Sequence, residues 1–172
     1  MMITHKSRFT QAGEKLSFDV ADYVFNIWRE GDEYFGSMDN GSPIHVHADR
    51  ASFIWVNLDQ SETPEIPWEE DFSEIDVQER YKVYNFDDYV LDHEYRNTGP
   101  YNWKILSDNF NECYHCPTAH PTIDSLADIE THDVQTDAGW IRHQSTPTEE
   151  QSELGMAIAS TYFFPNVSIS VL

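Results

Sequence analysis

Residues 102–121 read NWKILSDNFNECYHCPTAHP, and this stretch decides how the rest of the chain is interpreted. Its spacing predicts a helix over residues 102–116, with about 3.6 residues per turn. Proline cannot continue the helical hydrogen-bond ladder, so Pro117 is expected to end or kink that helix near Cys116. One side of the helix would be an apolar stripe of Trp103, Leu106, Phe110, Cys113 and Tyr114.

The opposite side of the predicted helix is unusual. It would carry Asp108, Glu112 and His115, spaced at i, i+4 and i+7, without the lysine and arginine of an ordinary solvent face. His120 follows His115 by five residues, which on a straight helix would set the two rings about 140° apart. A break at Pro117 could turn His120 back toward the same point. Two imidazoles beside a carboxylate indicate a site for a first-row metal, with iron, zinc, copper and nickel all open.

The stretch resembles the mononuclear-iron motif of Rieske-type non-haem iron oxygenase alpha subunits, the ring-hydroxylating oxygenase family. That motif is an Asn, then an acid, then Tyr-His, and a second His five residues later. The matching residues are Asn109, Glu112, Tyr114, His115 and His120. The longer run DNFNECYHCPTAHP is similar to the choline monooxygenase branch of the family.

The resemblance implies a role for each of these side chains. His115 and His120 would be two ligands of a mononuclear Fe(II), and the third ligand, an acid, would lie beyond Leu172. Glu112 would be the acid that bridges to the cluster of a neighbouring subunit and passes the electron. The alternative is that Glu112 only orients His115 by a hydrogen bond. Asn109 and Asp108 would lie near the iron, and Tyr114 is expected in the core.

The resemblance also implies an α+β fold. Residues 81–172 would be the N-terminal part of a helix-grip type catalytic domain, in which an antiparallel sheet wraps over a long helix. Residues 43–58 would be the remnant of a Rieske-domain hairpin and residues 59–80 an acidic linker, whereas residues 1–42 have no assignment. The chain stops inside an apolar run, and family members are longer, so we expect a fragment.

Local patterns predict the remaining elements. Residues 44–47 and 53–58 are β-rich runs that predict a hairpin, with His45 and His47 on the polar face of an edge strand. Trp68 and Phe72 are expected to pin the linker to a surface. Residues 81–95, 140–145 and 156–172 predict strands, and residues 122–137 predict a loop with one short helix.

The two cysteines, Cys113 and Cys116, lie inside the motif. We do not expect a disulfide framework, and the pair indicates a reducing compartment. A zinc site made with His115 and His120 would take all its ligands from eight residues, whereas structural zinc sites use two separated pairs. A Rieske 2Fe-2S cluster needs a Cys-x-His pair and a later Cys-x-x-His pair. Cys113-Tyr114-His115 matches only the first, Ala119 stands where the second needs a histidine, and no other cysteine exists in the chain.

The formal net charge is −21, with 31 acidic residues against 10 lysines and arginines. Such a chain is a poor partner for nucleic acid or anionic membranes, but it would attract a small cation or a basic redox partner. No signal peptide, transit peptide or membrane span is recognisable, so we expect a cytoplasmic protein, or a stromal one if the source is a plant.

The resemblance implies a monooxygenation, choline being converted to betaine aldehyde on the way to glycine betaine. Electrons would arrive from a ferredoxin or reductase, and the complete protein would be a homotrimer. Carnitine, glycine betaine or an aromatic ring are alternative substrates. A different class also stays open, namely an inactive or non-enzymatic fragment.

Overall fold

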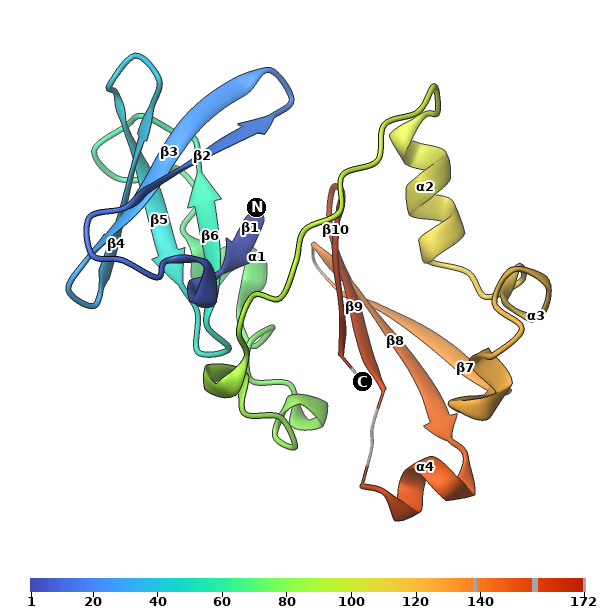
Figure 1. Cartoon of the computed structure of the whole chain (residues 1–172). Coiled ribbons are helices and arrows are strands. Elements are labelled where there is room, and N and C mark those ends of the chain that lie inside the picture. Colours follow the sequence, from blue (N-terminus) through green and yellow to red (C-terminus); the bar gives the residue numbers. More distant parts are fainter. Residues whose placement is uncertain (138, 156–157, 172) are drawn as a thin grey trace. The chain divides into compact units, whose positions relative to one another are not determined.

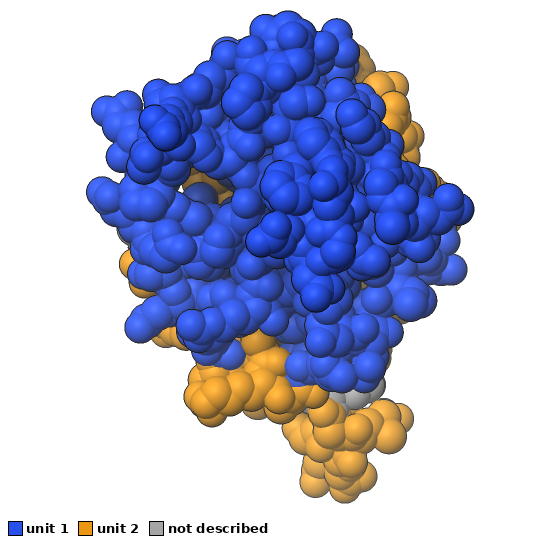
Figure 2. Space-filling view, turned by 90° about the vertical axis from the view of Figure 1, so that its left-hand side faces the viewer, with its two compact units in different colours: residues 1–78, 84–93 blue, residues 79–83, 94–172 orange. Residues whose placement is uncertain are grey.

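The computed structural model describes residues 1–137, 139–155 and 158–171. The chain divides into two compact units, one made of Met1–Gln78 and Tyr84–His93, the other of Glu79–Val83 and Glu94–Leu172 (Figure 2). Strands and helices are segregated within each unit, so the expected α+β class is confirmed. None of the helices in the described part of the chain is long and apolar enough to cross a membrane.

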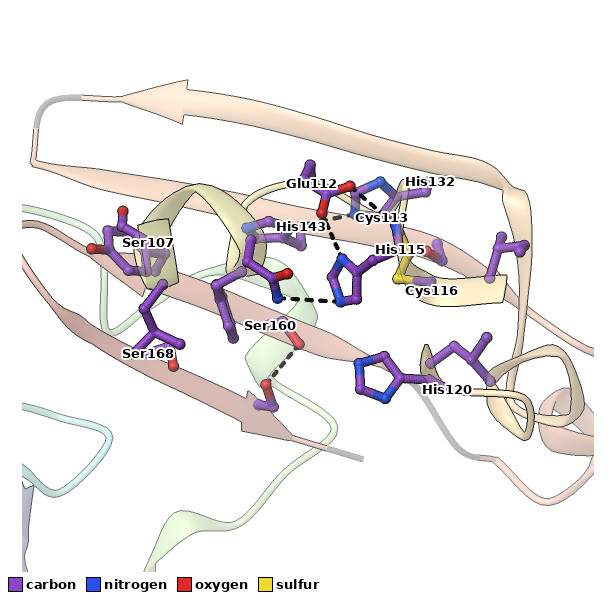
Figure 3. A pocket seen from close by; sticks show the side chains of 18 of the residues that line it. Ser107, Glu112, Cys113, His115, Cys116, His120, His132, His143, Ser160 and Ser168 are labelled. Atoms are coloured by element: carbon purple, nitrogen blue, oxygen red, sulfur yellow. Dashed lines mark hydrogen bonds and ion pairs between the residues drawn. A yellow bond between two sulfur atoms is a disulfide. The ribbon is translucent and has the colours of Figure 1, made fainter. Parts of the chain in front are cut away.

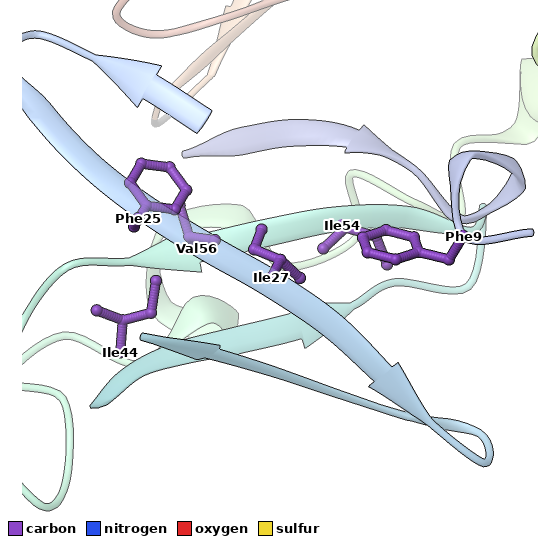
Figure 4. Packing of buried hydrophobic residues seen from close by; sticks show 6 residues of the cluster. All are labelled: Phe9, Phe25, Ile27, Ile44, Ile54 and Val56. Carbon is purple, nitrogen blue, oxygen red and sulfur yellow. The ribbon is translucent and has the colours of Figure 1, made fainter. Parts of the chain in front are cut away.

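The first unit is built on an antiparallel six-stranded sheet with the order β1-β6-β5-β4-β3-β2 (Figure 1). Its core is a cluster of buried apolar side chains contributed by β3, β5, β6 and the segment after β1, namely Phe9, Phe25, Ile27, Ile44, Ile54 and Val56 (Figure 4). The strands are β1 (Met2–His5), β2 (Lys15–Val20), β3 (Tyr23–Glu30), β4 (Glu33–Met38), β5 (Pro43–Ala48) and β6 (Phe53–Asn57).

The predicted hairpin of β5 and β6 is confirmed, with His45 opposite Asn57 and His47 opposite Trp55. The expectation that His45 and His47 lie on an edge strand is wrong, because β5 lies between β4 and β6. Residues 1–42, which the sequence left unassigned, supply the four other strands, β1–β4. The sheet is therefore much larger than a hairpin.

The acidic stretch after β6 contains the short helix α1 (Trp68–Phe72). The Trp68 ring stacks on His47 with centroids 4.1 Å apart, and Phe72 contacts Trp55 at 4.6 Å. Both predicted anchors are therefore confirmed. The predicted strand over residues 81–95 is wrong: this part forms the 3-10 turns η2 (Glu79–Tyr81) and η3 (Phe86–Asp88) and then runs without regular structure to residue 102.

The second unit carries a four-stranded antiparallel sheet with the order β10-β9-β8-β7. Its strands are β7 (Ala127–Asp137), β8 (Trp140–Pro147), β9 (Ala159–Phe163) and β10 (Val167–Val171), and its helices are α2 (Trp103–Phe110), α3 (Cys116–Ala119) and α4 (Glu149–Glu153), with the 3-10 turn η4 (Ile123–Ser125). The strands predicted over residues 140–145 and 156–172 are confirmed as β8, β9 and β10, apart from Met156, Ala157 and Leu172, which lie outside the described residues.

Residues 122–137 were predicted as a loop, and this is wrong beyond the turn η4. These residues form the strand β7 although their sequence is polar. Most side chains of β7 are exposed, and the strand is held mainly by its backbone pairing with β8. The pairing is irregular between Asp128 and Asp133, where the register shifts. His132 lies within this irregular part of β7.

The motif helix is shorter than predicted. It begins at Trp103, where the Asn102 side chain accepts a hydrogen bond from the Lys104 amide at 3.0 Å, and it ends at Phe110 rather than Cys116. Asn111 stops it, because its side-chain amide donates to the Ser107 carbonyl at 2.9 Å and so caps the last turn. The motif helix is therefore eight residues long.

Pro117 was expected to terminate a helix, but it lies in the first turn of α3. Proline suits that position, because a first-turn amide has no partner inside the helix. Asp108, Glu112 and His115 consequently do not form one helical stripe: Asp108 is on α2, Glu112 is in the connection, and His115 immediately precedes α3.

Candidate metal centre

A pocket of about 670 Å³ lies in the second unit and is lined by residues of α2, α3 and the four-stranded sheet (Figure 3). Trp103, Phe110 and Tyr162 contribute aromatic surface to its wall. His115, His120, His132 and His143 add four imidazoles. Aromatic walls combined with convergent polar side chains are typical of a small-molecule site.

The two histidines of the motif lie together at this pocket. His115 is the N-cap residue of α3 and His120 is its C-cap residue, so one short helix separates them. Their ring centroids are 5.2 Å apart and the ring planes are inclined by 74°. The interruption of the helix that the sequence required does occur, but it begins at Asn111, before His115, and not at Pro117.

Glu112 fixes the orientation of the His115 ring. The His115 Nδ1–H donates to Glu112 Oε1 at 2.6 Å, and Oε2 accepts from the Tyr114 amide and, at 3.3 Å, from the His115 amide. The hydrogen bond from the His115 ring is the largest influence that lowers the pKa of the Glu112 carboxyl, so Glu112 is a carboxylate at neutral pH. Because Nδ1 carries the proton, the lone pair of His115 is at Nε2.

The free nitrogen of His115 has a polar neighbour. The Asn109 side-chain nitrogen lies 3.4 Å from His115 Nε2, so its N–H points to the lone pair that a metal would use. Asn109 and Glu112 both line the pocket, whereas Asp108 is exposed on α2 and is not among the described lining residues. Asp108 therefore does not reach the site here.

Tyr114 was expected to pack in the core, and this is wrong, since its side chain is 95% exposed. The reason is the early end of α2, which removes Tyr114 from the apolar stripe and places it in the connection to α3. An exposed ring next to His115 contributes nothing to the packing of this unit.

Cys113 and Cys116 form a disulfide, contrary to our expectation. Their Cα atoms are 5.0 Å apart, within the range that a disulfide requires. The reducing compartment stays a prediction. The zinc alternative fails in this state, because neither sulfur is a thiolate that could bind the metal.

The arrangement fits two ligands of a mononuclear metal. His115 presents a lone pair at Nε2 and its ring lies beside that of His120, with Glu112 as the partner that fixes the tautomer. Among the described residues, no group of three or more His, Cys, Asp or Glu side chains could hold a metal ion. A 2Fe-2S cluster does not fit this chain, because its two cysteines are bonded to each other.

Sequence reasoning missed a second set of side chains at this pocket. His143 on β8 donates from Nε2 to Asn111 Oδ1 at 2.9 Å, and His132 on β7 lies 3.3 Å from His143 Nδ1. The only available signal was the alternation in residues 140–145, which puts His143 on one face of its strand. No local pattern pairs residues 111 and 143.

The sequence profile described as the ring hydroxylating alpha subunit (catalytic domain) matches residues 86–172, which is just over half of the chain. The chain belongs to the ring-hydroxylating alpha-subunit family. The match contains the whole candidate metal centre, from Asn109 to His143, so the site lies in the part of this alpha subunit that the family shares.

Two curated relatives of this alpha subunit are oxygenase subunits of carnitine monooxygenase. The relative from Acinetobacter pittii is 26% identical over 103 residues, and that from Acinetobacter baumannii is 27% identical over 103 residues. In both cases the alignment covers 59% of this chain and 27% of the relative. The chain therefore matches little more than a quarter of these proteins.

Solved structures of a quaternary ammonium Rieske monooxygenase, CntA, have the same fold. The complex of CntA with an inhibitor matches with a TM-score of 0.81 at 16% identity, and the complex with L-carnitine matches with 0.76 at 18%. Each alignment covers 99% of this chain and 60% of the CntA chain. At these identities the likeness establishes the fold alone.

Proposed function

We propose that the complete protein is a Rieske-type non-haem iron monooxygenase that acts on a small quaternary ammonium compound. One observation carries the proposal: His115 and His120 lie together at a pocket, and Glu112 holds the His115 ring with its Nε2 lone pair free of a proton. The two histidines would be two of the three protein ligands of a two-histidine, one-carboxylate site. Such a site leaves positions open on the iron.

Each residue then has a defined task. His115 and His120 would hold Fe(II), and the iron, when bound, supplies the activation of dioxygen beside the substrate. Glu112 keeps Nδ1 of His115 protonated, which keeps Nε2 available to the metal. Asn109 donates toward that same nitrogen and so marks the side of the ring on which the metal would bind.

The pocket suits a cation. Trp103, Phe110 and Tyr162 line it, and an aromatic face attracts a quaternary ammonium by about 0.5–2 kcal/mol per contact. The formal net charge of −21 adds a long-range attraction for a cation.

Two substrates are candidates within this class. Carnitine is favoured by the curated relatives, both of which are carnitine monooxygenase subunits. Choline is favoured by the pocket itself, because no lysine or arginine stands among its described lining residues to pair with the carboxylate of carnitine.

The electrons must come from outside this chain, because its own cysteines cannot hold a cluster. We propose that a 2Fe-2S centre elsewhere in the complete protein supplies them, fed by a ferredoxin or reductase. A homotrimer would bring such a centre to the neighbouring subunit, and Glu112, whose side chain is 40% exposed, is our candidate for the bridge.

Turnover tests the proposal directly. The complete protein, loaded anaerobically with Fe(II) and given a chemical electron donor and dioxygen, should oxidise choline or L-carnitine and leave naphthalene unchanged. Oxidation of naphthalene alone would replace the proposed substrate class by an aromatic one. Tight iron binding without turnover of any of these compounds would support the non-enzymatic alternative.

A further inference from the structure

A chain of hydrogen bonds outside the motif connects the sheet to the loop that carries Glu112. We infer that His143, held by His132, is a positioning residue of the metal centre, acting through Asn111 on Glu112 and His115. The inference rests on the proposed function, because it assigns to His143 a part in building the iron site.

The proton positions in this chain follow from the contacts. The Asn111 side-chain nitrogen donates to the Ser107 carbonyl at 2.9 Å, which fixes the orientation of the amide. Its Oδ1 must therefore be the acceptor of the 2.9 Å contact with His143, and His143 must carry its proton on Nε2. His143 Nδ1 is then an acceptor, and His132 Nε2–H, 3.3 Å away, is its donor.

The environment keeps His143 in this neutral form. Its side chain is only 7% exposed. Burial first, and then the neighbouring His132 and Arg80, lower the pKa of His143 to about 4. Arg80 also donates to the His143 carbonyl and, at 2.9 Å, to the Ser160 carbonyl, so it binds β8 and β9 together. The neutral ring can accept from His132 at Nδ1 while it donates to Asn111 from Nε2.

Asn111 connects His143 to the loop of residues 112–115, called the metal loop below. It caps α2 by two hydrogen bonds to the Ser107 carbonyl, one from its amide at 3.1 Å and one from its side chain. Glu112 is the next residue, and its carboxylate holds His115 Nδ1. Phe110, on the other side of Asn111, packs edge-on against His143 at 5.3 Å. Two contacts of His143 therefore hold the end of α2 to the sheet, one with Phe110 and one with the cap residue Asn111.

The consequence is specific to the metal. Without the donor at His143, Asn111 Oδ1 would be unpaired, and the hydrogen bond that ties the residue before Glu112 to β8 would be lost. The Glu112–His115 contact would then be held only within its own loop. Outer partners of metal ligands typically change metal affinity by about 10- to 100-fold, and we expect the lower end for His143 because it acts through two further residues.

The test uses Co(II) as a spectroscopic substitute for Fe(II) in the complete protein. His143→Leu should weaken Co(II) affinity about tenfold and alter the visible Co(II) spectrum, whereas His143→Gln, whose amide can still donate to Asn111, should stay within about threefold of wild type. Asn111→Leu should match His143→Leu, and the double variant should be no worse than either single one. His93→Gln, an exposed histidine of the other unit, is the matched control.

The outcomes separate the two proposals. If wild-type protein binds no Co(II), the proposed function fails and the inference fails with it. If wild-type and His143→Leu proteins bind Co(II) equally, with the same spectrum, only the inference fails. Should His143→Leu not fold, nitrogen NMR of wild-type protein still decides: a proton on Nε2 supports the positioning role, and a proton on Nδ1 overturns it.

Discussion

The buried histidine on β8 should make the stability of the second unit depend on pH. The pKa of His143 is about 4 in the folded protein, against about 6.5 for an unperturbed histidine. Between these values the unfolded chain binds more protons than the folded one, so the free energy of unfolding falls as the pH falls. Replacing His143 by Gln removes the titration but keeps a donor for Asn111.

The magnitude follows from the two pKa values. Proton binding by His143 in the unfolded chain lowers the free energy of unfolding by about 2 kcal/mol at pH 5, by roughly 0.8 kcal/mol at pH 6 and by almost nothing at pH 7.5. Relative to wild type, the His143→Gln protein should therefore gain about 2 kcal/mol of stability between pH 7.5 and pH 5.

The difference between the two proteins must be measured, because another group works in the opposite direction. Burial raises the pKa of Asp49 to about 6, although Trp55 and the Phe53 amide donate to its carboxyl. Its contribution to stability is lost as the pH rises from about 4 to 6, in the range where the contribution of His143 is gained. Asp49 belongs to the first unit and is unchanged in the variant, so it cancels.

Hydrogen exchange supplies the assay. The protection of backbone amides in β8 and β9 reports the free energy of opening of the second unit. Wild type and His143→Gln are compared at pH 5, 6 and 7.5, after correction for intrinsic exchange rates. If the free energies of opening of the two proteins change in parallel with pH, their difference stays constant within about 0.5 kcal/mol. That result would refute the assignment of a neutral buried His143.

The remaining predictions concern the metal loop and the sheet. Glu112→Ala, assayed at Fe(II) concentrations that keep the site filled, should stop turnover with the natural electron donor, and normal turnover would count against the bridge. Thiol titration of unfolded protein should find no free thiol before reduction and two after it, from Cys113 and Cys116; two thiols at the start would contradict the disulfide. Thr161→Val should lower the free energy of unfolding by about 1–2 kcal/mol, because it removes a buried hydroxyl that lies 2.6 Å from the Tyr81 hydroxyl; an unchanged denaturation midpoint would contradict this.

The sequence predicted what depends on neighbouring residues and missed what depends on distant ones. The pair His115 and His120 was found because five residues and a helix interruption suffice to bring them together. The strands β8 to β10 were found from their apolar alternation, whereas β7 is mostly exposed and has no such signal.

The early end of α2 could not be predicted from helical spacing. The residues after Phe110 continue the pattern of a helix, but the side chain of Asn111 competes for the Ser107 carbonyl, and His143, 32 residues away, holds that side chain in place. The disulfide closes the next turn. The strands of residues 1–42 could not be predicted for a related reason, since they are defined by their pairing partners in a six-stranded sheet.

Iron content after anaerobic loading is the most direct test of the two-histidine site. The complete protein, loaded with Fe(II) and passed through a desalting column, should retain about one iron per chain in the wild type and in His93→Ala. His115→Ala and His120→Ala should each retain almost none. Stoichiometric iron in His115→Ala would contradict the claim that these two imidazoles hold one ferrous ion.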